Sequence, residues 1–378
     1  MILPSQRSLF DIPTDVAYFN CAYMSPLLNQ AIKDGIRGLT TKSHPWKITS
    51  TDFFTDVERV RNLAALIIGC HDNNIALVPS TSYGIATAIN NIAIKPSDEI
   101  LILEHQFPSN VHGWHEAARS SKATVRTVPH SKDGNWTNSL LRMIHEKTKV
   151  VAIPHCHWSD GGLINLSLIA SALREIDAYL VIDATQSLGV MPLDIAAIKP
   201  DYVVASCYKW LLGPYSTAIM YVAPQHLDGT PIEHGWANRL GAEDFTSLAN
   251  YKSEFQIGAR RFDMGERSNF ALLPALAVAL QQILDWGIDT LYETISQMTS
   301  TIATQTSALG FRAIESNQRA GHFLGLTLHD KMLTDIVDEL AKQKIFISKR
   351  GKTLRITPHV YNNSSDINRL CEALALYV

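Results

Sequence analysis

The sequence of 378 residues lacks the features that mark nucleic-acid-binding, membrane or secreted proteins. Its formal net charge is −3 and its pI is about 6.5. It therefore lacks the excess of basic residues that binds nucleic acid or an anionic membrane surface. The five cysteines are scattered without a CxxC pair, which argues against a disulfide framework and favours a reducing cytoplasm. We expect no signal peptide, and no apolar run approaches the ~18 residues of a membrane span.

Motifs for nucleotides and metals are also missing. No Walker-type loop and no GxGxxG occurs, so a nucleotide is not the expected ligand. No HExxH motif occurs. No cysteines or carboxylates near the histidines supply the remaining ligands that a metal ion would need. We therefore expect no metal site.

Short apolar runs alternate with helical patterns in the first 225 residues, which predicts an α/β fold with a mostly parallel seven-stranded sheet and helices on both faces. The last two strands are joined by a connection too short for a helical crossover, which allows them to be antiparallel. The expected strands are residues 75–79, 99–104, 123–128, 149–154, 179–183, 202–206 and 217–222, with helices at 83–92, 111–120, 137–146 and 166–176.

The pattern changes after Gln225 and predicts a smaller α+β domain at the C-terminus. A long amphipathic segment at 270–309 predicts either one helix or two helices with a break near Trp286-Gly287. We assign residues 15–265 to a large α/β domain and residues 1–14 with 266–378 to the small one. The tail predicts strands at 322–328, 344–350 and 353–359, and helices at 332–343 and 365–376.

A cluster of hydroxyls follows the first predicted strand, where Ser80, Thr81 and Ser82 precede a helix that begins near Tyr83. Hydroxyls and free backbone N–H groups at a helix N-terminus form an anion site. Helix capping explains the same residues without a ligand.

Two charged residues stand where the sheet predicts a ligand site. Asp183 directly follows an apolar strand, and the carboxyl ends of parallel strands are where α/β sheets bind ligands. Lys209 lies between Tyr208 and Trp210 in an apolar setting, where burial would lower the pKa of its amine and suit it to form a Schiff base. A capping Asp and a Lys that reaches solvent are the alternatives.

An anion cradle, a carboxylate at a strand end and a downstream lysine are the parts that hold pyridoxal phosphate. The motifs DATQ at 183–186 and SCYK at 206–209, followed by GP at 213–214, resemble those of the class V aminotransferase group of fold-type I pyridoxal phosphate enzymes. The resemblance runs from YFNCAYMSPL to LRITPHVYNN, nearly the whole chain. It implies an enzyme whose cofactor is pyridoxal phosphate.

The resemblance assigns a role to each motif residue. Lys209 would bind the cofactor covalently and act as the catalytic amine, and Asp183 would pair with the pyridinium nitrogen. Gln186 would lie near the ring hydroxyl. Either Phe107 or His105 would stack on the ring, and we favour Phe107 because its face gains more contact. The implied phosphate contacts are Thr81, Ser206 and Tyr208, with Ser80 and Ser82 beside them.

Other segments bear on substrate and assembly. Arg355 matches the Arg that binds the substrate α-carboxylate, although a surface strand would also carry an Arg there. His157 stands at a strand end and is a candidate substrate contact. The loop at 265–269 matches one that reaches the phosphate of a partner subunit, which makes Ser268 a candidate contact and predicts a homodimer.

We therefore expect a cytoplasmic enzyme that acts on an amino acid by transamination, elimination or cyclodehydration. A cysteine desulfurase is not expected, because residues 347–354 contain no Cys before Arg355. Kynureninases carry a His at the position of Gln186. An epimerase of the same fold, or a non-catalytic sensor that binds the cofactor, is the alternative. No nucleic-acid or membrane partner is expected.

Overall fold

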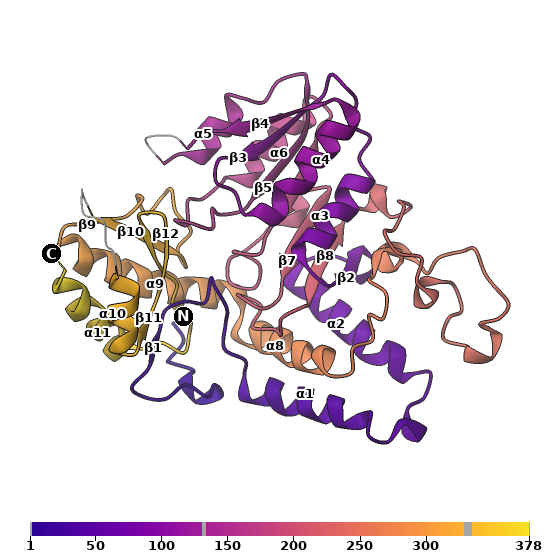
Figure 1. Cartoon of the computed structure of the whole chain (residues 1–378), viewed down its shortest axis with the longest axis horizontal. Coiled ribbons are helices and arrows are strands. Elements are labelled where there is room, and N and C mark those ends of the chain that lie inside the picture. The colour runs from indigo at the N-terminus through magenta and orange to yellow at the C-terminus, as the bar shows by residue number, and fades with distance from the viewer. Residues whose placement is uncertain (1, 131–133, 329–334, 378) are drawn as a thin grey trace.

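The computed structural model describes residues 2–130, 134–328 and 335–377 (Figure 1). Its central element is a seven-stranded sheet in the order β2-β8-β7-β6-β5-β3-β4. Only β8 runs antiparallel to its neighbours. The strands are β2 (Ile75–Val78), β3 (Glu99–Leu103), β4 (Thr124–Val128), β5 (Thr148–Pro154), β6 (Tyr179–Asp183), β7 (Tyr202–Ser206) and β8 (Ala218–Val222).

Apolar side chains cover the sheet on both faces, because alternate strand residues point to opposite sides. One core joins Leu77, Ile153 and Ile182 to α2 (Asp52–Ile68), α6 (Leu166–Arg174) and α8 (Leu272–Trp286). The second core lies on the other face. It joins Val78, Ala152 and Val181 to α3 (Thr81–Asn90) and α4 (His112–Ser121). The predicted fold class is therefore confirmed.

The predicted strands of this sheet agree with the structure to within one residue at most ends. The helix expected at 137–146 is shorter, since α5 (Trp136–Leu141) ends before His145, whose ring contacts Glu99 at 2.9 Å. The helices α1 (Asn29–Thr41) and α2 were not predicted, and neither was the short α7 (Ile195–Ile198).

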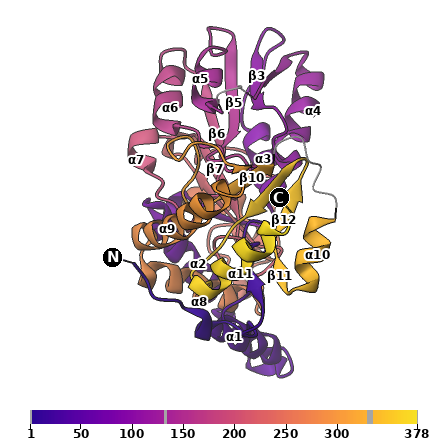
Figure 2. The same ribbon diagram turned by 90° about the vertical axis from the view of Figure 1, so that its left-hand side faces the viewer.

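The C-terminal part forms a second layer beside the large sheet (Figure 2). An antiparallel sheet in the order β12-β13-β10-β9 packs with α9 (Ile288–Ser307), α10 (Ile336–Lys342) and α11 (Ser364–Ala375) around a core of its own. Gly287, with a φ of 77°, separates α8 from α9 at the predicted break. The strands are β9 (Phe311–Arg312), β10 (Leu324–Leu328), β12 (Ser348–Arg350) and β13 (Thr353–Ile356).

Several boundaries in this part differ from the sequence prediction. The strand expected at 344–350 is two strands, because β11 (Ile345–Phe346) pairs with β1 (Ala17–Tyr18) whereas β12 pairs with β13. The strand expected at 353–359 ends at Ile356, shortly before Pro358, which has no backbone N–H to donate. Part of the helix expected at 332–343 lies outside the described residues.

The assignment of residues 15–265 and of 1–14 with 266–378 to two domains stays a prediction. Several contacts cross that division, and two of them involve whole helices or strands. The strand β1, at the start of the larger range, pairs in parallel with β11 of the smaller one. The helix α8, from the smaller range, packs against α1 and α2.

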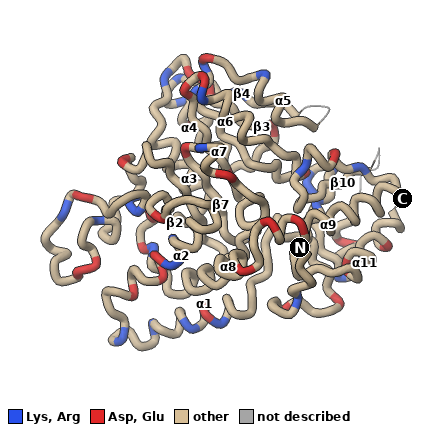
Figure 3. The backbone as a smooth tube through the Cα atoms, turned by 180° about the vertical axis from the view of Figure 1, so that it is seen from behind, with Lys and Arg blue, Asp and Glu red and all other residues tan. Residues whose placement is uncertain are grey.

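Charges of both signs are interspersed along the backbone (Figure 3). Among the described residues, no helix combines the length and apolar character needed to cross a bilayer.

A buried ion pair fixes the strand that leads into Ser80. Arg61 on α2 contacts Asp263 at 2.6 Å, and both side chains are fully buried. Asp263 also accepts a hydrogen bond from the backbone N–H of Leu77 on β2 at 2.8 Å. Arg267 lies 3.2 Å from the same carboxylate. Removing this charge would therefore take the carboxylate partner from Arg267 and leave Arg61 with only the partly exposed Glu58.

We predict that Asp263→Asn lowers the free energy of unfolding by about 3–5 kcal/mol, the cost typical of breaking a buried ion pair. Denaturant titration measures it. Asp228→Asn is the control, because Asp228 is exposed where it pairs with Arg261, and its loss should cost less than about 1 kcal/mol. Equal effects of the two variants would contradict the assignment.

Candidate active site

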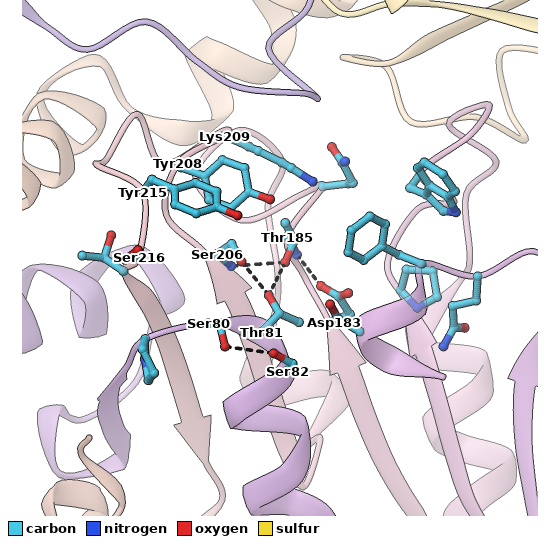
Figure 4. Close-up of a pocket in the computed structure, with 18 of the residues that line it drawn as sticks. Ser80, Thr81, Ser82, Asp183, Thr185, Ser206, Tyr208, Lys209, Tyr215 and Ser216 are labelled. Atoms are coloured by element: carbon cyan, nitrogen blue, oxygen red, sulfur yellow. Dashed lines mark hydrogen bonds between the residues drawn. The ribbon is translucent and has the colours of Figure 1, made fainter. Parts of the chain in front are cut away.

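A cavity of about 260 Å³ opens at the edge of the sheet where β2, β5, β6 and β7 end (Figure 4). The strands run in the same direction here, so the residues that follow them come together. Most of the predicted site residues line it, namely Ser80, Thr81, Ser82, Phe107, Asp183, Gln186, Ser206, Tyr208 and Lys209.

Hydroxyl groups gather at the N-terminus of α3. The Thr81 hydroxyl contacts that of Ser206 at 2.7 Å and that of Thr185 at 3.0 Å. Ser80 caps the helix by accepting a hydrogen bond from the N–H of Tyr83 at 3.2 Å. The capping interpretation of Ser80 is therefore correct. The helix terminus and the hydroxyls still offer donors to an anion in the cavity.

This approach of α3 to the sheet depends on Gly84. A Cβ atom there would lie 2.6 Å from a methyl group of Val204 on β7. Glycine therefore lets the first turn of α3 reach the end of β7, where Ser206 lies.

Asp183 is a buried carboxylate that forms no salt bridge. It is 7% exposed and accepts a hydrogen bond from the N–H of Thr185 at 3.0 Å. Among the described residues, no Lys, Arg or His nitrogen lies within salt-bridge distance of it. Burial raises the pKa of Asp183. A cationic ligand in the cavity would reverse that effect.

Lys209 is a buried amine on the same cavity. It is 6% exposed, and its Nζ lies 5.2 Å from the centre of the Phe107 ring. Burial lowers the pKa of Lys209 to about 8, although Asp183 acts in the opposite direction. The interpretation of Lys209 as a side chain that reaches solvent is therefore wrong. Its neutral form, the nucleophile, is available near neutral pH.

Aromatic residues form one wall of the cavity. Phe107 and Trp158 pack edge to face, with ring centres 5.3 Å apart. The alternative stacking candidate, His105, does not line the cavity, and its side chain is 83% exposed. The structure therefore places Phe107, and not His105, at the cavity.

Both ends of the Gln186 amide are held. Its oxygen accepts a hydrogen bond from the Trp210 indole at 2.8 Å, and its nitrogen donates to the carbonyl of Ala22 at 3.1 Å. The backbone carbonyl of Gln186 contacts the ring of His322 at 2.6 Å. Gln186 thus presents its side chain to the cavity in one fixed orientation.

Arg355 lies on β13, behind the aromatic wall. It is 1% exposed, which excludes the surface-strand interpretation. Its Nε donates to the Ser348 hydroxyl at 2.9 Å and one Nη to the carbonyl of Trp158 at 3.0 Å, while the other Nη has no partner. Burial lowers the pKa of Arg355, and the nearby Arg350 lowers it further. A buried guanidinium with an unpaired N–H donor is costly, and binding an anion would offset that cost.

Three predicted residues do not line the cavity, namely Arg355, which lies behind its aromatic wall, His157 and Ser268. The ring of His157 is buried against Trp136 and bonds to the Ser159 hydroxyl at 2.7 Å and the Glu104 carbonyl at 3.1 Å, away from the cavity. Ser268 also lies outside the cavity, and its hydroxyl donates to the carbonyl of Phe53.

Sequence reasoning missed other residues that line the cavity. Thr185 accepts a hydrogen bond from the N–H of Ser206 at 3.1 Å as well as contacting Thr81. Its position two residues after a strand end was the available signal. The loop at 215–217 and Cys156 also line the cavity, and nothing in their local sequence indicates it.

Comparisons with known proteins identify the family of the chain. The family model described as "Aminotransferase class-V" matches residues 43–370. An uncharacterized aminotransferase of Bacillus subtilis, YcbU, is 25% identical, over 99% of this chain and 98% of its own. A probable cysteine desulfurase of Halalkalibacterium halodurans is 25% identical, over 77% of this chain and 75% of its own. The chain belongs to the class V aminotransferase family.

The solved structures show the same fold. A mutant of the protein C-DES with glycine covalently linked to its pyridoxal phosphate cofactor superposes with a TM-score of 0.87. It is 20% identical, over 98% of this chain and 99% of its own. The chain is therefore an enzyme of this family, and its cofactor is pyridoxal phosphate.

The cavity fits that cofactor. Asp183 is a buried anion without a cation, which suits a protonated pyridine nitrogen. The hydroxyls at the N-terminus of α3 suit a phosphate.

We predict that competitive labelling of cofactor-free protein with acetic anhydride detects the lowered pKa of Lys209. Labelling of an amine rises with pH as its proton is lost. For Lys209 the rise should be centred near pH 8, well below the value of about 10.4 that a lysine has in a model peptide. Peptide mass spectrometry reads Lys209 and an added reference peptide in one sample. A Lys209 profile that parallels that of the reference peptide would contradict the lowered pKa.

Proposed function

We propose that Lys209 binds the cofactor covalently and then moves the proton at the Cα of an amino acid. One observation carries this proposal: Lys209 and Asp183 are both buried at one cavity, and no ion pair joins them. Opposite buried charges normally pair, so their separation leaves a place for a group between them. Bound pyridoxal phosphate supplies the electron sink for a carbanion at Cα.

The other cavity residues would hold the cofactor. Asp183 would keep the pyridine nitrogen protonated, and Phe107 would cover the ring face. The fixed amide of Gln186 would lie near the ring hydroxyl. The phosphate would be bound by Ser80, Thr81, Ser82, Thr185, Ser206 and Tyr208.

Arg355 supports an amino acid as the substrate. Its planar fork has one buried donor without a partner, and a carboxylate accepts two parallel bonds from such a fork. Binding the α-carboxylate there would fix the remaining Cα substituents relative to Lys209. Proton transfer by the neutral Lys209 amine then depends on the pKa that burial sets.

We propose that the enzyme is not a cysteine desulfurase, although relatives carry that name. Persulfide transfer needs a thiolate, and no Cys lies between Ile347 and Arg355. Cys156 does line the cavity, but its thiol is buried against the Gln186 carbonyl, at 3.4 Å, and burial raises its pKa far above neutrality. Transamination or a lyase reaction is the expected outcome.

We also propose that two copies assemble. Lys209 is the only Lys or Arg side chain lining the cavity in the described part of the chain, so the phosphate lacks a fixed cation there. The segment between β8 and α8 extends from the body (Figure 1). Like α1, it exposes apolar side chains. Such patches mark interfaces. They include Ile36 and Leu39 on α1, Trp46 shortly after it, and Trp236, Leu240 and Tyr251 before α8.

The proposed location is the cytoplasm, since all five cysteines are free in the structure.

The function is tested by incubating holoenzyme with amino acids, with and without a 2-oxo acid, and analysing products and their chirality. We expect products of transamination or elimination. With cysteine as the substrate, we expect no persulfide on the enzyme and no stoichiometric release of sulfur. Asp183→Asn should lower turnover about 10²–10⁴-fold, as for other lost electrostatic groups. Stoichiometric sulfur transfer from cysteine would contradict the reaction assignment, and wild-type turnover by Asp183→Asn would contradict the site.

We predict that light scattering gives a mass of twice the 41.9 kDa of the chain. Ile36→Asp with Leu39→Asp should produce monomers, because it places two charges in the exposed apolar face of α1. Leu376→Asp, an exposed position near the C-terminus, is the control. A fully active wild-type monomer would refute the dimer.

A further inference from the structure

The hairpin of β12 and β13 carries two arginines on one face. Ser348 pairs with Arg355, and Arg350 pairs with Thr353, across the antiparallel ladder. Because side chains alternate along a strand, Arg350 and Arg355 are diagonal neighbours on the same side. Like charges at such positions repel each other, so this arrangement does not serve the stability of the hairpin.

Both guanidinium groups lie against Trp158. The central carbon of Arg350 is 5.5 Å from the centre of the indole ring, and that of Arg355 is 5.7 Å from it. Trp158 itself lines the cavity. The hairpin can approach this loop because β10 carries Gly325, where a Cβ atom would lie 2.8 Å from the backbone of Asp160. The two cations therefore stand together at the aromatic wall of the active site.

No acidic side chain neutralises the pair. Within the described ranges, no carboxylate oxygen lies within salt-bridge distance of Arg350 or Arg355. Asp160 is on the same loop as Trp158, but its carboxylate accepts from the N–H of Gly162 at 2.9 Å and contacts His130 at 3.3 Å. An α-carboxylate on Arg355 would still leave Arg350 without an anion.

We propose that the substrate is an amino acid whose side chain carries a second acidic group, which Arg350 binds while Arg355 binds the α-carboxylate. This inference rests on the proposed function, since it takes Arg355 as the α-carboxylate site. Two guanidinium forks on one face suit two carboxylates of one molecule, because each fork can bind its carboxylate with two parallel bonds. A neutral side chain would leave Arg350 with the Lys349 carbonyl, to which it donates at 2.7 Å, and with no anion.

The test titrates holoenzyme with aspartate, glutamate and 2-aminoadipate, and with the neutral analogues asparagine and glutamine. The change in cofactor absorbance gives each Kd. At least one acidic amino acid should bind tenfold or more tighter than its neutral counterpart. Arg350→Gln should weaken binding of that acid about tenfold to hundredfold, the worth of a hydrogen bond to a charged group, and change the neutral analogue less than about twofold.

Controls separate charge from fold. Lys352→Gln removes an equal charge from the exposed turn of the same hairpin and should leave the preference intact. Arg350→Lys keeps the positive charge but loses the planar guanidinium, so it should weaken binding of the acidic amino acid by an intermediate amount. This variant replaces Arg350→Gln in the test if Arg350→Gln fails to fold. Calorimetry compares the binding of the dicarboxylates succinate and glutarate with that of the monocarboxylates acetate and butyrate. These compounds have no amino group, so the comparison of one acid group with two is made without turnover.

The outcomes distinguish the two proposals. If acidic and neutral amino acids bind equally while Arg355→Gln weakens both, the second-acid inference is overturned and the proposed function stands. If no amino acid binds or alters the cofactor spectrum, the proposed function itself fails. A preference for acids that survives Arg350→Gln would also overturn the assignment to Arg350.

Discussion

The active site depends on keeping a buried carboxylate and a buried amine apart. Asp183 and Lys209 come from adjacent parts of the sheet edge, and each loses hydration in the folded chain. Direct pairing would offset part of that cost. The structure instead leaves both facing the cavity, where the carboxyl pKa is raised and the amine pKa is lowered. We propose that a cofactor with a basic ring nitrogen and a reactive aldehyde would pair with Asp183 and react with Lys209.

The rest of the fold holds these groups in place. The parallel strands β5, β6 and β7 bring their carboxyl ends to one edge, and β2 adds the helix terminus that carries Thr81. The Arg61–Asp263 pair ties β2 to α2 through the N–H of Leu77. On the opposite side, the hairpin of β12 and β13 places Arg355 and Arg350 behind Trp158. The groups proposed to bind cofactor and substrate thus come from different layers of the molecule.

The sequence predicts the sheet and its site well because both rest on local signals. Apolar runs such as VVAI in β5 are buried on both faces. Asp183 ends such a run in β6, and Lys209 lies in the loop after β7. The helices α1 and α2 escape prediction because no strand run precedes them to set the alternating pattern. His157 resembles a site residue by its position at a strand end, but its ring forms hydrogen bonds with the Ser159 hydroxyl and the Glu104 carbonyl. Such choices depend on tertiary contacts that a single sequence does not contain.

The central claim is that Asp183 holds a proton on the pyridine nitrogen of the cofactor. Nitrogen-15 NMR of holoenzyme reconstituted with cofactor labelled at that nitrogen tests it most directly. The account predicts the chemical shift of a protonated nitrogen in the wild type, moving toward the unprotonated value in Asp183→Asn. An unprotonated nitrogen in the wild-type enzyme, or the same shift in both proteins, would contradict it.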